Sequence, residues 1–107
     1  MTRFEDELSR NNFVCSKCMK CIHWVWPPSE FCNKCLGNVE WLHVPSNATL
    51  VEFSRKGDAY FCIAEFENSI RVIGTISEPI SDLIPGQMLI LEYCTYDKTP
   101  KFVFKIS

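Results

Sequence analysis

Long apolar runs and an excess of basic charge are both missing from this 107-residue chain. No stretch approaches the roughly 20 apolar residues that a membrane-spanning helix needs, so we expect no membrane span. Thirteen acidic residues against eleven basic ones give a formal net charge of −2. Proteins whose main task is to bind phosphate backbones are usually basic, so the charge makes nucleic acid a less favoured partner.

Catalytic signatures are missing as well. The sequence has no glycine-rich phosphate loop, no nucleophile elbow and no paired catalytic motif, and it contains only four glycines. We therefore expect a protein that is not an enzyme and has no catalytic residue. The first ten residues, MTRFEDELSR, are acidic rather than apolar, which predicts no secretory leader. Together with cysteines that are kept reduced, this predicts a cytoplasmic protein.

What the chain has instead is a dense group of cysteines. Five of its seven cysteines lie within CSKCMKCIHWVWPPSEFCNKC, which spans residues 15–35. Two Cys-x-x-Cys pairs on opposite arms of a short hairpin can place four thiolates around one tetrahedral metal ion. A thioredoxin-like redox motif needs only one such pair, so the second pair favours a structural zinc ion. Four thiolates also hold iron in electron-transfer proteins, and spacing alone does not separate the two metals.

The first arm of the hairpin offers two overlapping pairs, Cys15 with Cys18 and Cys18 with Cys21. The first choice leaves thirteen residues before Cys32 and the second leaves ten, and local spacing permits both. His23 lies among the cysteines and can ligate zinc. Because four thiolates already complete a tetrahedral shell, we expect this histidine to be a bystander.

A short helix is expected over residues 2–11. Thr2 and Glu5 match a capping box, and Phe4 and Leu8 lie one helical turn apart. A helix of this length is marginal when isolated. Its narrow apolar stripe must therefore dock, either on the rest of the chain or on another protein.

From residue 48 onward the pattern becomes all-β. Alternation and turn residues predict strands at 48–54, 58–67, 69–77, 87–95 and 101–106, with a connector at 78–85 that is too short for a full helix. Three strands, a connector and a final pair fit a small OB-type barrel. Strands 58–67 and 87–95 are apolar on both faces. We therefore expect one face of each strand to be buried in the barrel interior and the other to be covered by the cysteine-rich ribbon that precedes the barrel or by a partner. Cys62 and Cys94 are expected to be small buried hydrophobes.

A cysteine hairpin followed by an OB barrel resembles a family of OB-fold proteins that accompany thiolases and related acyl-CoA enzymes in archaea and bacteria. Its members combine an N-terminal helix, a rubredoxin-like zinc ribbon and the barrel. The segment CMKCIHWVWPPSEFCNKC fits the family pattern without a gap when the ribbon starts at Cys18, and the likeness continues through the Ile84-Pro85-Gly86-Gln87 turn. On this resemblance the zinc ligands are Cys18, Cys21, Cys32 and Cys35, with Cys15 as a spare thiol.

The chain departs from the family pattern at two positions in the cysteine hairpin. Glycine commonly follows each Cys-x-x-Cys in the family, whereas this chain has Ile22 and Leu36. A bulky residue is sterically disfavoured there if the backbone φ angle is positive.

Pattern and resemblance together predict a mainly β fold with a short N-terminal helix (1–12), a rubredoxin-like zinc ribbon (13–45) and a five-stranded OB-fold barrel (46–107). The resemblance implies a non-catalytic scaffold subunit that bridges thiolase and a hydroxymethylglutaryl-CoA synthase of the mevalonate pathway. Such a subunit also helps to form a coenzyme A site.

Arg55 and Lys56, after the first barrel strand, are candidate contacts for the coenzyme A phosphates, although solvated loop side chains are commoner. The alternative function is a single-stranded nucleic-acid-binding module in which Tyr60, Phe66 and Tyr93 stack on bases.

Overall fold

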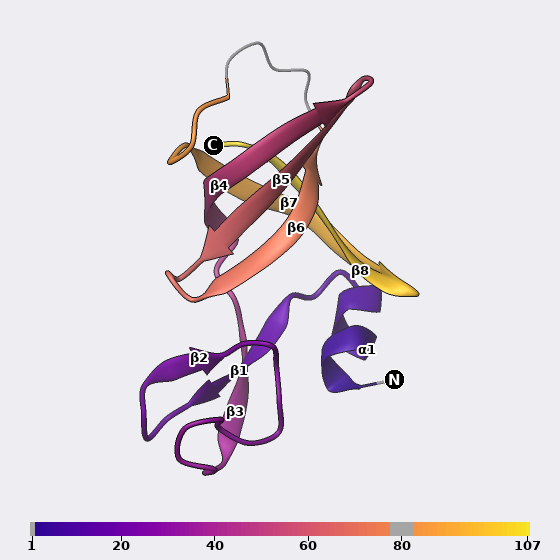
Figure 1. Ribbon diagram of the computed structural model, residues 1–107. Helices are drawn as coiled ribbons and strands as arrows, with labels where there is room; N and C mark the ends of the chain where they lie inside the picture. Colours follow the sequence, from indigo (N-terminus) through magenta and orange to yellow (C-terminus); the bar gives the residue numbers. More distant parts are fainter. Residues whose placement is uncertain (1, 78–82) are drawn as a thin grey trace.

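The computed structural model describes residues 2–77 and 83–107, in which a short helix precedes a three-stranded sheet and a closed barrel (Figure 1). Helix α1 spans Arg3–Ser9. The first sheet has the order β2-β1-β3, with β1 Val14–Cys18, β2 His23–Val25 and β3 Val39–His43. The barrel has the order β4-β5-β6-β8-β7, with β4 Asn47–Lys56, β5 Ala59–Phe66, β6 Ile70–Ile76, β7 Met88–Asp97 and β8 Thr99–Ile106. The predicted fold class, a mainly β chain with an N-terminal helix, a cysteine-rich ribbon and a five-stranded barrel, is confirmed.

The barrel closes where β6 runs parallel to β8, with Thr75 opposite Val103. All other neighbouring barrel strands are antiparallel. Gly74 makes the close approach possible, because a Cβ atom there would lie 2.7 Å from the carbonyl oxygen of Phe102 and 2.7 Å from the ring of Phe104. The prediction for the connector at 78–85 falls mostly on residues 78–82, which lie outside the described residues.

Helix α1 begins with the predicted capping box. The amide of Glu5 donates to the Thr2 hydroxyl at 3.2 Å, and the Thr2 amide donates to the Glu5 carboxylate at 3.0 Å. The helix ends two residues earlier than predicted, at Ser9, because Asn11 adopts the left-handed conformation with φ of 63°.

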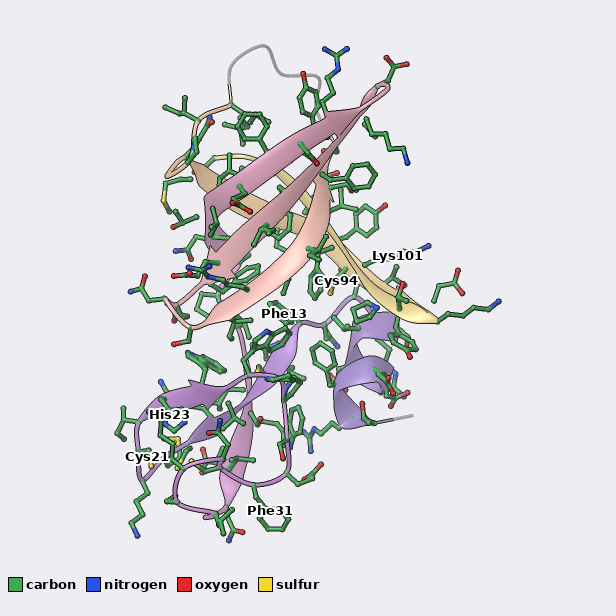
Figure 2. The ribbon with its side chains drawn as sticks, viewed as in Figure 1. Phe13, Cys21, His23, Phe31, Cys94 and Lys101 are labelled. Atoms are coloured by element: carbon green, nitrogen blue, oxygen red, sulfur yellow. The ribbon has the colours of Figure 1, made fainter. Side chains whose placement is uncertain are left out.

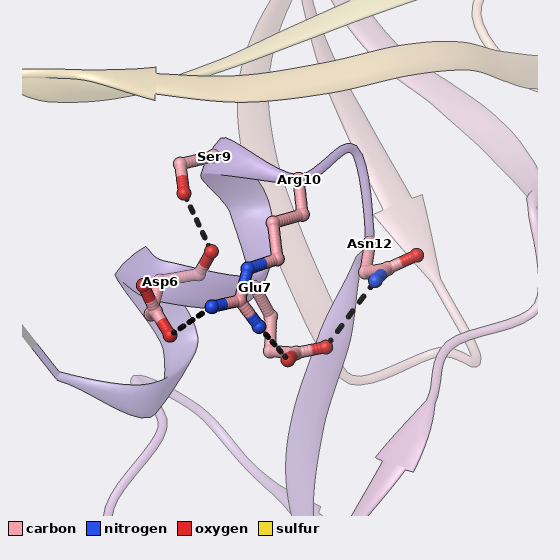
Figure 3. A network of polar contacts seen from close by, with 5 residues as sticks. All are labelled: Asp6, Glu7, Ser9, Arg10 and Asn12. Carbon is pink, nitrogen blue, oxygen red and sulfur yellow. Dashed lines mark hydrogen bonds and ion pairs between the residues drawn. The ribbon is translucent and has the colours of Figure 1, made fainter.

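Polar contacts hold the end of α1 (Figure 3). Arg10 lies 3.4 Å from the Asp6 carboxylate and 3.8 Å from that of Glu7, and Asn12 donates to Glu7 at 3.4 Å. These pairs are exposed or half-buried, so each contributes only a few tenths of a kcal/mol, roughly 0.3–0.5 for an exposed helical pair. Their effect is to define where the chain leaves the helix and enters the ribbon.

The helix, the ribbon and the barrel share one apolar core. Phe4 and Leu8 are buried in it, so the helix docks on its own chain. The Phe13 ring, which Figure 2 labels between ribbon and barrel, lies 5.0 Å from the rings of both Phe66 and Phe102. Below the barrel, the Asn11 side chain accepts a 2.8 Å hydrogen bond from the amide of Cys94 in β7. The ribbon is therefore packed against one end of the barrel.

Candidate metal centre

Four cysteine side chains converge at the end of the ribbon that points away from the barrel, near the Cys21 label in Figure 2. Their Sγ atoms all lie within 4.8 Å of one another, with Cys18 3.7 Å from Cys35 and Cys21 3.9 Å from Cys32. Four sulfurs placed 2.3 Å from a tetrahedral zinc ion would be about 3.8 Å apart. The arrangement therefore fits a metal ion. Iron bound by four thiolates has a similar shape, so the geometry supports a metal site without identifying the metal.

Two tight turns position the cysteines. In the first, the amide of Cys21 donates to the Cys18 sulfur at 3.3 Å. In the second, the amides of Lys34 and Gly37 donate to the sulfurs of Cys32 and Cys35, both at 3.4 Å. Backbone N–H groups that point at sulfur stabilise thiolates, which are the form that binds metal.

Buried Ser16 joins the two arms of the ribbon, since its hydroxyl accepts a 3.1 Å hydrogen bond from the amide of Ser29.

The thiols of the cluster differ in how readily they lose a proton. Hydrogen bonds from backbone amides, first that of Cys35 and then that of Lys34, lower the pKa of Cys32 to about 6. The neighbouring sulfurs, Cys35 first, raise the pKa of Cys21 to about 12. Once one thiolate has formed, a second negative charge beside it is unfavourable unless a cation is present. Metal binding therefore displaces protons from the cluster.

Cys15 lies apart from the cluster. Its side chain is fully buried in the core shared with the barrel, and its thiol donates to the carbonyl oxygen of Val25 at 3.2 Å. Burial raises the pKa of this thiol to about 12, so it stays protonated at neutral pH. The structure thus brings together the four cysteines that the resemblance selects and leaves Cys15 out.

His23 sits beside the cluster at the start of β2. Its Nε2 lies 3.8 Å from the sulfur of Cys32. A contact of this length with sulfur is weak, and the side chains whose ligand atoms all lie within 4.8 Å of one another are the four cysteines alone among the described residues.

The backbone is left-handed at the two positions where the family that the sequence resembles commonly has glycine. Ile22 has a φ of 54° and Leu36 a φ of 57°. Left-handed backbone costs an L-residue roughly 1–2 kcal/mol, and bulky or β-branched side chains are the least suited to it. Both side chains project into solvent. From the sequence, Ile22 and Leu36 stood out only as departures from the family pattern, and no function was predicted for them.

The candidate coenzyme A contacts lie elsewhere. Arg55 and Lys56 end strand β4, at the hairpin farthest from the ribbon in Figure 1. The Arg55 Nε donates to the carbonyl oxygen of Gly57 at 2.9 Å, and its guanidinium lies 5.7 Å from the centre of the Tyr60 ring. The structure does not bring either residue to the metal centre.

The outside of the barrel carries a second feature. Phe61, Thr75, Val103 and Tyr93 stand opposite one another across four neighbouring strands. Together with Ile73 they line a hollow of about 410 Å³. The prediction that the ribbon or a partner covers the apolar outer faces of strands 58–67 and 87–95 is thus not met by the ribbon at Phe61 and Tyr93, which remain exposed.

One candidate for base stacking is wrong. Phe66 is fully buried in the barrel core, so its ring is not available to a nucleic acid. Cys62 and Cys94 are buried as predicted, and burial raises the pKa of each thiol to about 11.

No helix in residues 2–77 and 83–107 is long and apolar enough to cross a membrane.

No family model matches the sequence, and no curated protein does. Several solved structures share its fold. One is the Ltp2–ChsH2(DUF35) aldolase, with a TM-score of 0.75 and 13% sequence identity over 99% of this chain and 96% of the matched chain.

Another is a DUF35-family protein of unknown function from Sulfolobus solfataricus. It matches with a TM-score of 0.67 and 15% identity over 98% of this chain and 83% of its own. These two structural neighbours are therefore DUF35 proteins, and the fold implied by the sequence resemblance is the fold that this chain adopts.

Proposed function

We propose that the chain is a non-catalytic accessory subunit that binds an acyl-CoA-processing enzyme. The observation that carries the proposal is the fold match over 99% of the chain to the Ltp2–ChsH2(DUF35) aldolase. That name joins a DUF35 component to a second protein, Ltp2, within one enzyme. We assign the chemistry to the partner enzyme, and to this chain the role of the DUF35 component.

The metal centre suits a structural role in this subunit, with zinc as the metal. Four thiolates fill a tetrahedral shell, whereas a catalytic zinc site keeps one position open for water or substrate. The only other buried residue in the apolar cluster around Cys18 and Cys32 is Val25, among the residues that the structure describes. Such a small cluster stabilises the ribbon little, so we assign much of its stability to the metal. A reducing compartment such as the cytoplasm would keep the thiols available.

Within this role, the sequence resemblance supports thiolase as the partner, a hydroxymethylglutaryl-CoA synthase as a second partner, and a coenzyme A site shared between them. Arg55 and Lys56 are our candidate contacts for the phosphates in that site. Replacing both with alanine should weaken coenzyme A binding to the assembled complex, measured by calorimetry. Unchanged affinity would remove these two residues from the proposal and leave the accessory role intact.

The test of the accessory role is affinity purification of the tagged full chain from its native cells, with co-eluting proteins identified by mass spectrometry. We expect a thiolase or another acyl-CoA enzyme in a stoichiometric amount. Recovery of ribosomal or transcription proteins instead would contradict the proposal. The absorption spectrum of the same preparation tests the metal, because iron bound by four thiolates is red and zinc is colourless.

A second candidate function is single-stranded nucleic-acid binding. Exposed Phe53, Phe61 and Tyr93 on the outside of an OB-type barrel favour it, because bases stack on such rings. The net charge of −2 counts against it. An affinity for a single-stranded oligonucleotide that falls steeply with salt would support this candidate over the first.

A further inference from the structure

Each metal-site cysteine has an exposed apolar residue directly beside it in the sequence. Met19 follows Cys18, Ile22 follows Cys21, Phe31 precedes Cys32, and Leu36 follows Cys35. The exposed fractions of these four side chains are 47%, 65%, 56% and 77% in the same order. We call these four residues the knuckle tip. Because the four sulfurs lie within 4.8 Å of one another, the four neighbours lie around the sulfur cluster, at the end of the ribbon where Figure 2 labels Phe31.

Backbone strain indicates that the knuckle tip is kept for a contact outside the chain. Ile22 and Leu36 both have positive φ angles, a conformation that glycine adopts at little cost. Each is more than half exposed, so its side chain gains little from burial within the chain. Each side chain therefore strains the backbone without being buried in its own chain, which favours a contact with another molecule.

Charge also follows a repeated pattern at this end. Lys20-Cys21-Ile22 and Lys34-Cys35-Leu36 place an exposed lysine and an exposed aliphatic residue on either side of a metal-site cysteine. Neither ammonium group forms an ion pair with a carboxylate of the described residues, so both can pair with carboxylates of a partner.

We infer that the knuckle tip docks into an apolar hollow, flanked by carboxylates, on the surface of the acyl-CoA enzyme. The inference rests on the proposed function and adds to it the docking surface and the chemistry of its partner. The aliphatic and aromatic side chains fill the hollow, and Lys20 and Lys34 face the carboxylates. A lipid surface is a poorer match, because recognition of anionic membranes uses clusters of roughly four to eight basic residues.

The test compares two variants of the full chain. Ile22→Gly with Leu36→Gly removes two tip side chains and relieves the strain. Ile73→Thr with Tyr93→Thr is the matched control, since it removes two similarly exposed side chains from the barrel and keeps strand-forming residues. The enzyme recovered with the wild-type chain is purified alone, and its dissociation constant for each variant is measured by calorimetry, with thermal unfolding and metal content as checks on folding.

We expect the tip variant to bind the enzyme at least roughly tenfold more weakly, while it melts no lower than the wild type and keeps its metal. The barrel variant should bind as the wild type does. In addition, benzoylphenylalanine in place of Phe31 should cross-link to a surface of the enzyme that is apolar and flanked by Asp or Glu.

Loss of binding in the barrel variant alone would overturn the tip assignment and leave the accessory role standing. If the knuckle tip binds vesicles of phosphatidylcholine and phosphatidylglycerol, its partner is a membrane and not the enzyme. If the wild type forms a dimer that the tip variant abolishes, the partner is a second copy of the chain. If purification of the wild-type chain recovers no acyl-CoA enzyme, the proposed function is contradicted. The assignment of such an enzyme as the partner of the knuckle tip is then contradicted too.

Discussion

Cys15 and Cys18 differ by three positions in one strand, yet their replacement should have very different effects. Serine is the matched change at both sites, because a hydroxyl is a poor zinc ligand but still a hydrogen-bond donor. In Cys15→Ser the hydroxyl can still donate to the Val25 carbonyl that now accepts from the thiol at 3.2 Å. The loss is then the better burial of sulfur over oxygen, about 1–2 kcal/mol. In Cys18→Ser one of the four thiolates is lost.

These losses convert to measurable shifts. A chain of 107 residues has an unfolding entropy of about 0.2 kcal/mol/K, so Cys15→Ser should melt about 5–9 °C lower and still bind one metal ion per chain. Cys18→Ser should lose the metal, whose binding free energy in structural zinc sites is roughly 10–16 kcal/mol. Elemental analysis gives the metal content, and thermal unfolding with and without a chelator gives the stability. A Cys15→Ser protein without metal, beside a Cys18→Ser protein that retains it, would refute the assignment.

Three further predictions concern single features of the structure. Gly74→Ala should lower the free energy of unfolding by about 1–3 kcal/mol in chemical denaturation, because its Cβ would lie 2.7 Å from the Phe104 ring. Stability should fall as pH rises from about 9 to about 11, by about 1.4 kcal/mol per pH unit for each buried thiol, because the raised pKa values of Cys62 and Cys94 keep them protonated only while folded. Alanine at both positions should remove their share of that slope and leave the share of Cys15, whose pKa burial raises to about 12. His23→Ala should leave the metal content unchanged, and a loss of metal would make the histidine a ligand.

The barrel could be predicted well because its signals are local. The last strand alternates, and the structure buries Phe102 and Phe104 while Lys101 and Lys105 face solvent. The observed strands β4 and β7 run two residues past the predictions, since hairpin pairing continues through polar residues as far as Lys56 and Asp97. Backbone hydrogen bonds, which do not depend on side-chain type, carry the pairing that far.

The ribbon was harder to predict. Strands β1 and β2 were not predicted, because five residues in β1 and three in β2 are too few to show a clear alternation. This also explains why spacing could not choose between Cys15 and Cys18. Side chains three positions apart in a strand point to opposite faces, so only one of the two can face the knuckle. The choice depends on a strand that the sequence pattern does not reveal, and only the family resemblance selected Cys18.

The left-handed turns at Ile22 and Leu36 connect the metal centre to the proposed docking surface. Strain of roughly 1–2 kcal/mol at each residue is a large cost for a ribbon with so small an apolar cluster. A structural metal would supply several times that amount and would hold the turns through the neighbouring cysteines. With the turns held by sulfur–metal bonds, glycine would no longer be required after each Cys-x-x-Cys. The chain can then place side chains there that serve a partner, and a ribbon stabilised by metal becomes a rigid support for an apolar contact.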